Sequence, residues 1–248
     1  MGSEMCIRDS ENDVDRKDEE RTVLDDESRI AALPVAPPAL LRDRPTTERG
    51  TRTRAALVAA ARKVFERSGY LDARLIDIAK EAGCATGSFY TYFANKEEVF
   101  AAVLEVARDD MMHPGMGRVA SADDPYAVLE ASNRAYLAAY QRNAKLMGLM
   151  EQVAHIDPEF RKFRSERANA FIRRNARGIA DLQSRGIADT ALDPMTASIA
   201  LSGMVSRLAY SLFTLREGEV DGRSPEFDQI VATVTDLWAN ALKFPDRL

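Results

Sequence analysis

The sequence predicts an all-α protein, with a head of three short helices followed by a bundle of longer ones. From Thr51 onward, apolar residues recur at intervals of three and four, the spacing of amphipathic helices. Asp-Pro pairs at 157–158 and 193–194 are typical helix starts, with a capping residue and proline in the first turn. No stretch alternates apolar and polar residues over a useful strand length. About nine helices are expected.

The first 45 residues differ in composition from the rest. Residues 1–10, MGSEMCIRDS, resemble the translation of a transposase adaptor used in sequencing libraries, which makes Cys84 the only native cysteine. Residues 11–45 are acidic, then proline-bearing, and lack aromatic side chains. Such a segment buries too little apolar surface to offset its ordering entropy. We expect residues 1–45 to lie outside the fold.

The head is expected in residues 46–95. Its first helix has an apolar face and stops at Gly69; the face contains Val58, Ala61, Val64 and Phe65. A second short helix, LIDIAKEAG, closes at Gly83, and a third runs from Ala85 or Thr86 to Phe93. Two short helices joined by a glycine turn, with a helix ahead of them, follow the helix-turn-helix plan.

Residues 96–248 are expected to form the helical body. A fourth helix is capped by Asn95, carries acidic residues in its first turn and runs to Met112 before the break HPGMG. Longer helices are expected at residues 124–142, 144–155, 158–185, 194–216 and 228–243.

Charge is unevenly distributed along the 248 residues. The net charge is −5, and the first 50 residues hold 13 acidic and 8 basic side chains, so the remainder is neutral. Within residues 42–67, eight basic side chains face three acidic ones, immediately before an aromatic stretch. A local basic surplus of this kind is typical of a nucleic-acid-binding surface.

Several kinds of site are not expected. No apolar run of about 18 residues predicts a membrane span, and no secretory leader is seen. With two cysteines and two histidines, neither a disulfide framework nor a multi-ligand zinc site is expected. His113 and His155 lack metal-ligand spacing, and no phosphate-binding, dinucleotide or nucleophile motif is present. We expect a cytoplasmic protein with no cofactor, no metal and no catalytic site.

The aromatic stretch FYTYF, residues 89–93, suggests a DNA-contacting helix. Phe89 and Phe93 share one face and are expected to pack inward. The Tyr90 and Tyr92 hydroxyls are suited to phosphate contacts, which position a protein without reading sequence. Small residues on the same helix are suited to base edges in the major groove: Thr86, Gly87, Ser88 and Thr91.

At these residues the chain resembles the TetR family of transcriptional regulators. The matching segments, within roughly residues 51–100, are Gly69-Tyr70, IDIAKEAG (76–83), GSFYTYF (87–93) and NKEEVF (95–100). The resemblance implies phosphate contacts from Tyr90, Tyr92 and Lys96, and base contacts from Thr86, Gly87, Ser88 and Thr91. The family commonly has Thr or Ser opening the second helix, whereas this chain has Arg74, which cannot cap a helix but can reach a phosphate.

The body offers soft apolar side chains for a ligand pocket, since methionine adapts to irregular cavities. The candidate pocket residues are Met111, Met112, Tyr136, Tyr140, Met147, Met150, Phe171 and Met204. The alternative is that these residues are ordinary core. The last two helices are apolar with small residues, and the resemblance implies a four-helix dimer interface there. Candidate interface residues are Ser202, Gly203, Leu208 and Trp238.

The sequence therefore predicts a ligand-responsive transcriptional regulator, most simply a repressor. It is expected to bind a palindromic double-stranded operator as a homodimer and to be released by a small apolar or amphipathic effector. One alternative is a ligand-independent DNA-binding or adaptor protein. A more distant one is an enzyme that uses the helical pocket.

Overall fold

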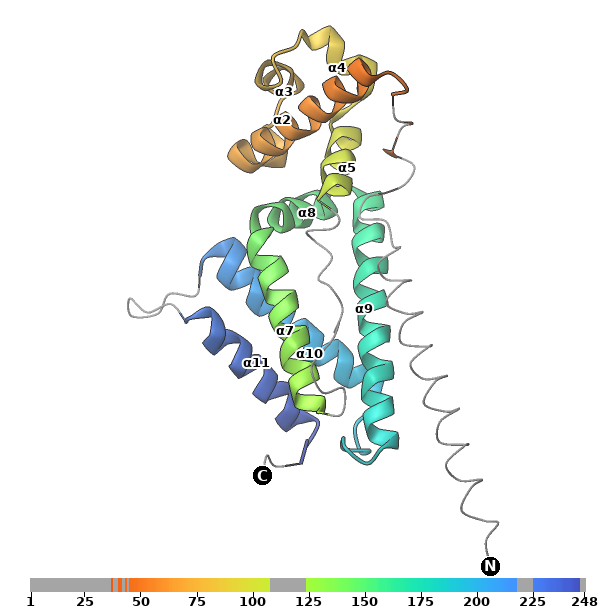
Figure 1. The fold of residues 1–248 in the computed structure, drawn as a ribbon, viewed down its shortest axis with the longest axis vertical. Coiled ribbons are helices and arrows are strands. Elements are labelled where there is room, and N and C mark those ends of the chain that lie inside the picture. The colour runs from red at the N-terminus through yellow and green to blue at the C-terminus, as the bar shows by residue number, and fades with distance from the viewer. Residues whose placement is uncertain are drawn as a thin grey trace, which may run out of the picture. The chain divides into compact units, whose positions relative to one another are not determined.

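The computed structural model describes residues 37, 40, 41, 43, 45–107, 124–217 and 225–245. All of these belong to one unit of the chain, Pro34–Leu248. The described residues form helices and no strand, which confirms the predicted all-α class (Figure 1). Most of the predicted extension, residues 1–45, lies outside the described residues, but Leu40 and Leu41 are described and pack against the apolar core, so the expectation that the whole extension lies outside the fold is wrong for these two residues. Met111, Met112 and the predicted break at His113–Gly117 also lie outside the described residues.

Four helices form the head and its connection to the body: α2 (Glu48–Asp72), α3 (Leu75–Glu81), α4 (Thr86–Tyr92) and α5 (Lys96–Val106). The turn between α3 and α4 depends on Gly83, whose φ of 68° is left-handed. There the Cys84 amide donates to the Ala79 carbonyl at 3.0 Å, which satisfies the end of α3. The predicted cap of α5 is confirmed, because Asn95 Oδ1 accepts from the Glu98 amide at 2.8 Å.

Gly69 interrupts α2 at the place where the sequence predicts a stop. Its backbone has φ 76° and ψ 170°, a conformation inside α2 that is not helical. After it, one further turn carries Tyr70 back onto the core, where the ring stacks on Phe65 at 5.6 Å between centroids. Only glycine adopts this backbone region readily, so the break is encoded by a single residue.

The body helices agree closely with the expected ranges: α7 (Pro125–Arg142), α8 (Ala144–Ile156), α9 (Pro158–Ser184), α10 (Pro194–Ala209) and α11 (Phe227–Ala241). The Asp157 side chain accepts from the amides of Glu159 and Phe160, and Asp193 accepts from Thr196. Both predicted Asp-Pro starts are therefore confirmed. One feature was not predicted: the last part of the fourth body helix is a π-helical segment, η2 (Tyr210–Leu215).

Two apolar clusters hold the described helices together. The first joins the head to α5, α8 and α9, and its largest side chains include Phe65, Phe100 and Phe160. The second lies among α7, α10 and α11, and includes Trp238. Met147 packs against both clusters. The predicted domain boundary at residues 95/96 falls at the cap of α5, but it does not separate two cores.

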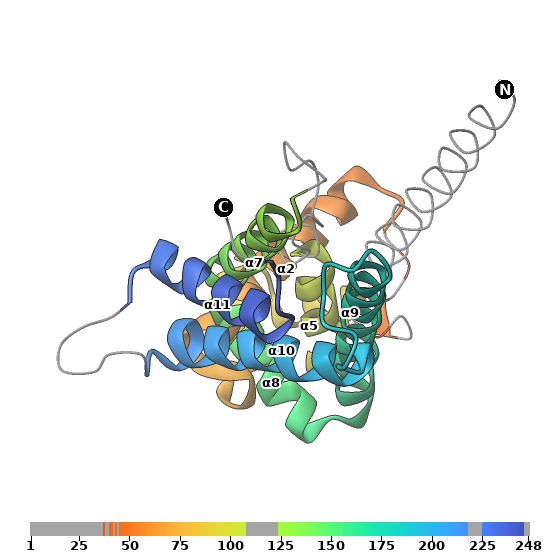
Figure 2. The same cartoon turned by 90° about the horizontal axis from the view of Figure 1, so that it is seen from below.

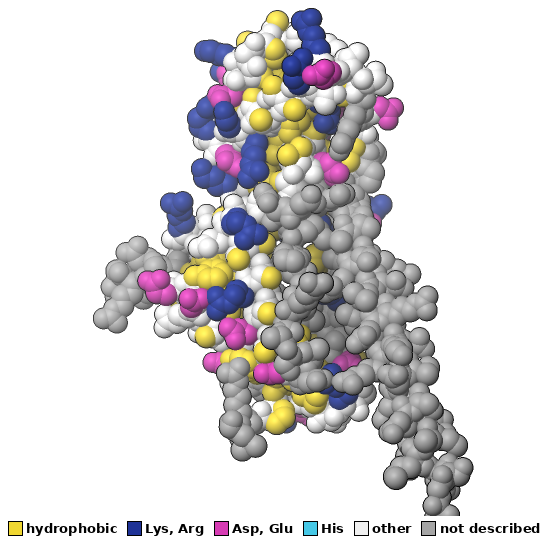
Figure 3. Space-filling view, in the orientation of Figure 1, with side chains coloured by type: hydrophobic (Ala, Val, Ile, Leu, Met, Phe, Trp, Pro, Cys, Tyr) yellow, Lys and Arg dark blue, Asp and Glu magenta, His cyan; other side chains and the backbone are white. Residues whose placement is uncertain are grey.

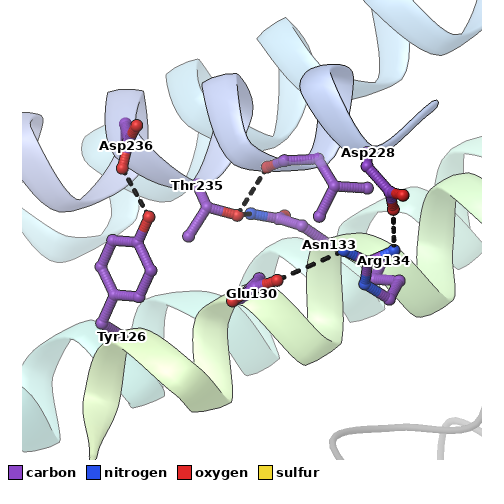
Figure 4. Close-up of polar contacts among 8 residues, drawn as sticks. Tyr126, Glu130, Asn133, Arg134, Asp228, Thr235 and Asp236 are labelled. Atoms are coloured by element: carbon purple, nitrogen blue, oxygen red, sulfur yellow. Dashed lines mark hydrogen bonds and ion pairs between the residues drawn. The ribbon is translucent and has the colours of Figure 1, made fainter. Parts of the chain in front are cut away.

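A line of polar contacts fixes α7 against α11, which lie side by side in Figures 1 and 2. At its centre, the buried Asn133 Nδ2 donates to Thr235 Oγ1 at 3.1 Å, and Thr235 Oγ1 donates to the Val231 carbonyl at 2.8 Å (Figure 4). Flanking contacts join Tyr126 to Asp236 and Arg134 to Asp228. Because a buried amide must keep its partner, this line sets the register of the two helices.

We predict that Gly69→Ala destabilises the protein. An alanine at φ 76° and ψ 170° is strained by about 1–3 kcal/mol. Gly178→Ala is the matched control, since Gly178 lies in α9, has no positive φ, and a Cβ there meets nothing within 4 Å. The control should raise the free energy of unfolding by about 0.5–1 kcal/mol. Denaturant unfolding of both variants measures the difference; equal effects of the two substitutions would contradict a special role for Gly69.

Candidate nucleic-acid interface

The helix α4 presents an apolar side to the core and small polar residues to solvent. Phe89 is fully buried and Phe93 nearly so, in the same cluster as Ile78 and Phe65. On the other side Thr86, Gly87 and Thr91 are exposed and Ser88 is half-buried. The four residues that the sequence assigns to base contacts therefore lie on or beside one accessible face.

Gly87 has no reason within the described residues to be glycine. Its φ is not positive, and a Cβ added to it meets nothing within 4 Å. A glycine in a helix costs stability relative to alanine. Its small size is therefore explained by what approaches α4 from outside, rather than by packing within the chain.

The two tyrosines of α4 differ in their surroundings. Tyr90 is 53% exposed, and its ring meets the edge of Phe89 at 5.6 Å between centroids. Tyr92 is half-buried and packs against the apolar cluster of the head. Tyr90 thus presents most of its ring and hydroxyl, whereas Tyr92 presents only part of its side chain.

Arg74 precedes α3 and forms an ion pair instead of a cap. Its Nε donates to Asp77 Oδ2 at 2.9 Å and its second guanidinium nitrogen to Oδ1 at 3.4 Å. This hydrogen bonding holds the pKa of the Asp77 carboxyl below its ordinary value. The Arg74 side chain does not cap α3. The Asp77 amide at the start of this helix donates to the Arg74 backbone carbonyl. The exposed guanidinium is held in place near the head surface.

Lys96 makes contacts that the sequence did not predict. Its Nζ donates to the carbonyls of Tyr70 at 2.9 Å and Leu71 at 3.0 Å, and lies 4.9 Å from the centroid of the Tyr70 ring. The Tyr70 hydroxyl in turn donates to Glu97 Oε1 at 2.9 Å, and burial raises the pKa of that hydroxyl. The start of α5 is thereby tied to the end of α2.

The head surface carries many cations, several of them already paired. Arg62 Nε contacts Glu66 at 2.9 Å, and both Lys63 and Arg67 lie 3.5 Å from the carboxylate of Glu81. Figure 3 shows Lys and Arg side chains spread over this face of the head and over the region of the body below it. Of the predicted basic surplus, the described side chains of Arg49, Arg52, Lys63 and Arg67 are exposed on the head.

The candidate pocket residues of the body fall into separate groups. Tyr136, Tyr140, Met147 and Met204 share the second cluster, with the two tyrosine rings 6.0 Å apart. Burial raises the pKa of Tyr140 to about 12. Met150 is buried in the first cluster instead. Phe171, on α9, lies between the guanidinium groups of Arg167 at 5.7 Å and Arg174 at 5.2 Å.

The candidate dimer residues also differ from one another in exposure. Gly203 is exposed with open space at its Cβ, and Ser202 is half-buried. Leu208 packs partly on the second cluster, and Trp238 is only 6% exposed within that cluster. Two exposed apolar residues were missed, Ile199 at 53% and Met195 at 42%. Their four-residue spacing from Gly203 marks the open face of α10.

The open face of α10 belongs to an unusually apolar helical stretch. Pro194–Leu215 is the one candidate found in the described part of the chain that is long and apolar enough to cross a membrane, a test that the core helix of a soluble protein also passes. Only 17% of its most apolar window is buried. The stretch therefore leaves apolar surface that a neighbouring molecule can cover. Within the same described residues, no group of three potential metal ligands is found.

Comparisons with known proteins agree with this geometry. A family profile described as "Bacterial regulatory proteins, tetR family" matches residues 57–103, from α2 into α5. The HTH-type transcriptional regulator EthR of Mycolicibacterium smegmatis is 24% identical over 190 residues, covering 76% of this chain and 85% of EthR.

Solved structures share the fold. The fatty acid degradation regulator FadR from Bacillus halodurans aligns with a TM-score of 0.59 and 19% identity, over 78% of this chain and 97% of FadR. A SmeT–triclosan complex aligns with a TM-score of 0.57 and 20% identity, over 77% of this chain and 91% of SmeT.

The head, the exposed face of α4 and these similarities define a DNA-binding transcriptional regulator of the helix-turn-helix class. The match to the TetR family covers residues 57–103 and includes the motifs on which the resemblance in the sequence rests. The similar proteins named above are regulators and not enzymes, in agreement with the prediction for this chain.

We predict that Lys96→Met destabilises the head even without DNA. The change removes two hydrogen bonds from a cation to the Tyr70 and Leu71 carbonyls, at a cost of about 1–2 kcal/mol. Lys80→Met is the control, because Lys80 is an exposed cation of the same head. Thermal unfolding should show a lower midpoint for Lys96→Met than for Lys80→Met. Indistinguishable midpoints would mean that the carbonyl contacts contribute nothing.

Proposed function

We propose that the protein is a dimeric repressor that binds a palindromic operator and leaves it when a small apolar or amphipathic effector binds. The single observation that carries the proposal is the outer face of α4. It combines exposed Thr86 and Thr91 with a glycine whose missing side chain serves nothing within the described chain. A helix with such a face fits closely into a major groove.

Each exposed group of the head has a proposed role on DNA. Thr86, Gly87, Ser88 and Thr91 meet base edges, while the Tyr90 hydroxyl binds a phosphate. Tyr92, which is half-buried, places its hydroxyl at a phosphate beside the same face. The exposed Arg74 guanidinium adds a cation near the backbone. Lys96 keeps one N–H beyond the two used on carbonyls, so a phosphate contact from it is compatible with its role at the end of α2.

The proposed dimer forms through α10 and α11. Met195, Ile199 and Gly203 give α10 an open and apolar face, and Leu237 is exposed on α11. A two-fold axis through these helices pairs two heads, as a palindrome of half-sites about 34–36 Å apart requires. Ser202 lies beside this face, whereas Leu208 and Trp238 support it from within the protomer.

The proposed effector site lies in the body, near Tyr136, Tyr140, Met147 and Met204. The mixture of aromatic rings and methionines suits an apolar or amphipathic molecule. The similar structure of SmeT is that of a complex with triclosan, which supports a small-molecule effector. The protein is proposed to act in the bacterial cytoplasm.

Coupling between the two sites is proposed to pass through α5 and Met147. Met147 packs against both clusters, and α5 begins at the head and lies in the cluster that also contains α8 and α9. An effector that displaces Met147 therefore disturbs the packing that positions the head. By linkage, operator DNA then weakens effector binding by the same factor, typically about 5–150-fold.

We predict that Gly87→Ala weakens DNA binding without weakening the fold. Nothing lies within 4 Å of the new Cβ, so the free energy of unfolding should stay equal or rise by about 0.5–1 kcal/mol. DNA affinity should fall, because the methyl group separates α4 from the groove. Gly178→Ala provides the control with the same chemical change on α9. Fluorescence anisotropy with a duplex selected from random sequences measures the affinity. An unchanged Kd would show that α4 does not form part of the DNA interface.

We predict that Gly203→Asp produces monomers that keep their helical content. A carboxylate on the open face of α10 loses its hydration in the proposed interface without gaining a partner. Gly178→Asp carries the same charge and the same loss of glycine at an open position of α9, and should remain dimeric. Light scattering after size-exclusion chromatography gives the mass. Dimers of Gly203→Asp at the wild-type dissociation constant would rule out this face.

A further inference from the structure

A groove of about 920 Å³ lies where the head meets the body, next to the proposed effector site. It is bounded by three segments that are distant in sequence: α2, the junction of α7 with α8, and the end of η2 with the residues around it. Helix α8 lies beneath α2 and packs against it (Figure 1). The volume is that of a site for a medium-sized organic molecule.

The groove is lined by cations that lack acidic partners. Arg142, Lys145 and Arg216 are exposed at its walls, and no carboxylate among the described residues pairs with any of them. Arg62 and the carboxylate of Glu66 also line the groove, and they pair with each other at 2.9 Å. Three charges of one sign thus converge on one concave surface, which raises the local concentration of anions.

The first turn of α8 forms part of the same wall. Asn143 occupies the N-cap position of α8, but its side chain makes no capping hydrogen bond to that helix. Its Nδ2 donates instead to the Ala139 carbonyl at 3.0 Å. Ala144 and Lys145, the first two residues of α8, form part of the groove lining, so the positive end of the helix dipole lies at this wall. This helix end strengthens a basic groove that the three side chains already define.

The floor of the groove is apolar. Leu146 is fully buried beneath it, and Phe213 lines it from η2. The Phe213 ring lies 6.4 Å from the ring of Tyr140, on the side toward the second cluster. A ligand that is complementary to both the basic wall and the apolar floor has a compact acid group at one end and an apolar portion at the other.

We propose that this groove is a second ligand site, specific for amphipathic organic anions with a phosphate or carboxylate head. The acid group lies among Arg142, Lys145 and Arg216, beside the start of α8. The apolar portion covers Leu146 and Phe213. The site goes beyond the proposed function, because it needs neither operator DNA nor the effector, and it can be measured on the free protein.

The test is calorimetric titration of the full-length protein with three probes: octyl phosphate below its micelle-forming concentration, octan-1-ol and inorganic phosphate. Octyl phosphate should bind more tightly than either of the others, and its affinity should fall as salt is added. If octan-1-ol bound as tightly as octyl phosphate, the groove would have no anion site and the proposal would be contradicted. Inorganic phosphate binding as tightly as octyl phosphate would remove the apolar floor.

The location is tested with the double variant Lys145→Gln/Arg216→Gln and a matched control, Lys162→Gln/Arg173→Gln, which removes two exposed cations from α9. The groove variant should bind octyl phosphate at least about tenfold more weakly, since each charge-assisted contact contributes that much or more. The control should bind as the wild type does. The single variant Arg142→Gln gives a second reading if the double variant unfolds at a lower temperature. Wild-type affinity in the folded groove variants would overturn the proposal.

Discussion

Packing among four aromatic rings from three helices holds the head in position. Phe65 and Tyr70 come from α2, Phe100 from α5 and Phe160 from α9, and consecutive ring centroids lie 5.2–5.6 Å apart. All four side chains are buried. Aromatic pairs at such distances are stabilised beyond the area that they bury. The head therefore shares its core with the body, and the position of α4 depends on packing that extends to α9.

This shared core explains why small features near it have large structural roles. Gly69 returns the chain so that Tyr70 can join the rings, and the carbonyls exposed after that break receive the Lys96 ammonium. Glu97 accepts from the Tyr70 hydroxyl in the same place. A change in the body that moves α5 or α9 has to rearrange this cluster or carry the head with it, because a close-packed core does not deform gradually.

The sequence predicted the elements whose signals are local. Asp157-Pro158 and Asp193-Pro194 place helix starts because the cap, the proline and the first amides are neighbours in the chain. The inward face of α4 followed from the spacing of Phe89 and Phe93.

Features that depend on residues far apart in the sequence could not be predicted from the sequence. Lys96 contacts carbonyls 25 and 26 positions earlier, so its role at the end of α2 is visible only in three dimensions. Trp238 lies in an apolar helix with apolar residues on both sides, and sequence alone did not show that its ring faces inward. The basic groove combines residues from α2, α8 and η2, and no local pattern marks it.

Helix α4, held by the shared aromatic core, is the surface that we propose meets DNA. Hydrogen–deuterium exchange of the protein alone and bound to a duplex selected from random sequences tests this most directly. We expect the strongest added protection in Thr86–Tyr92 and little in the outer surface of α9. Selection of no duplex, or protection that leaves α4 unchanged while another surface becomes protected, would contradict the account.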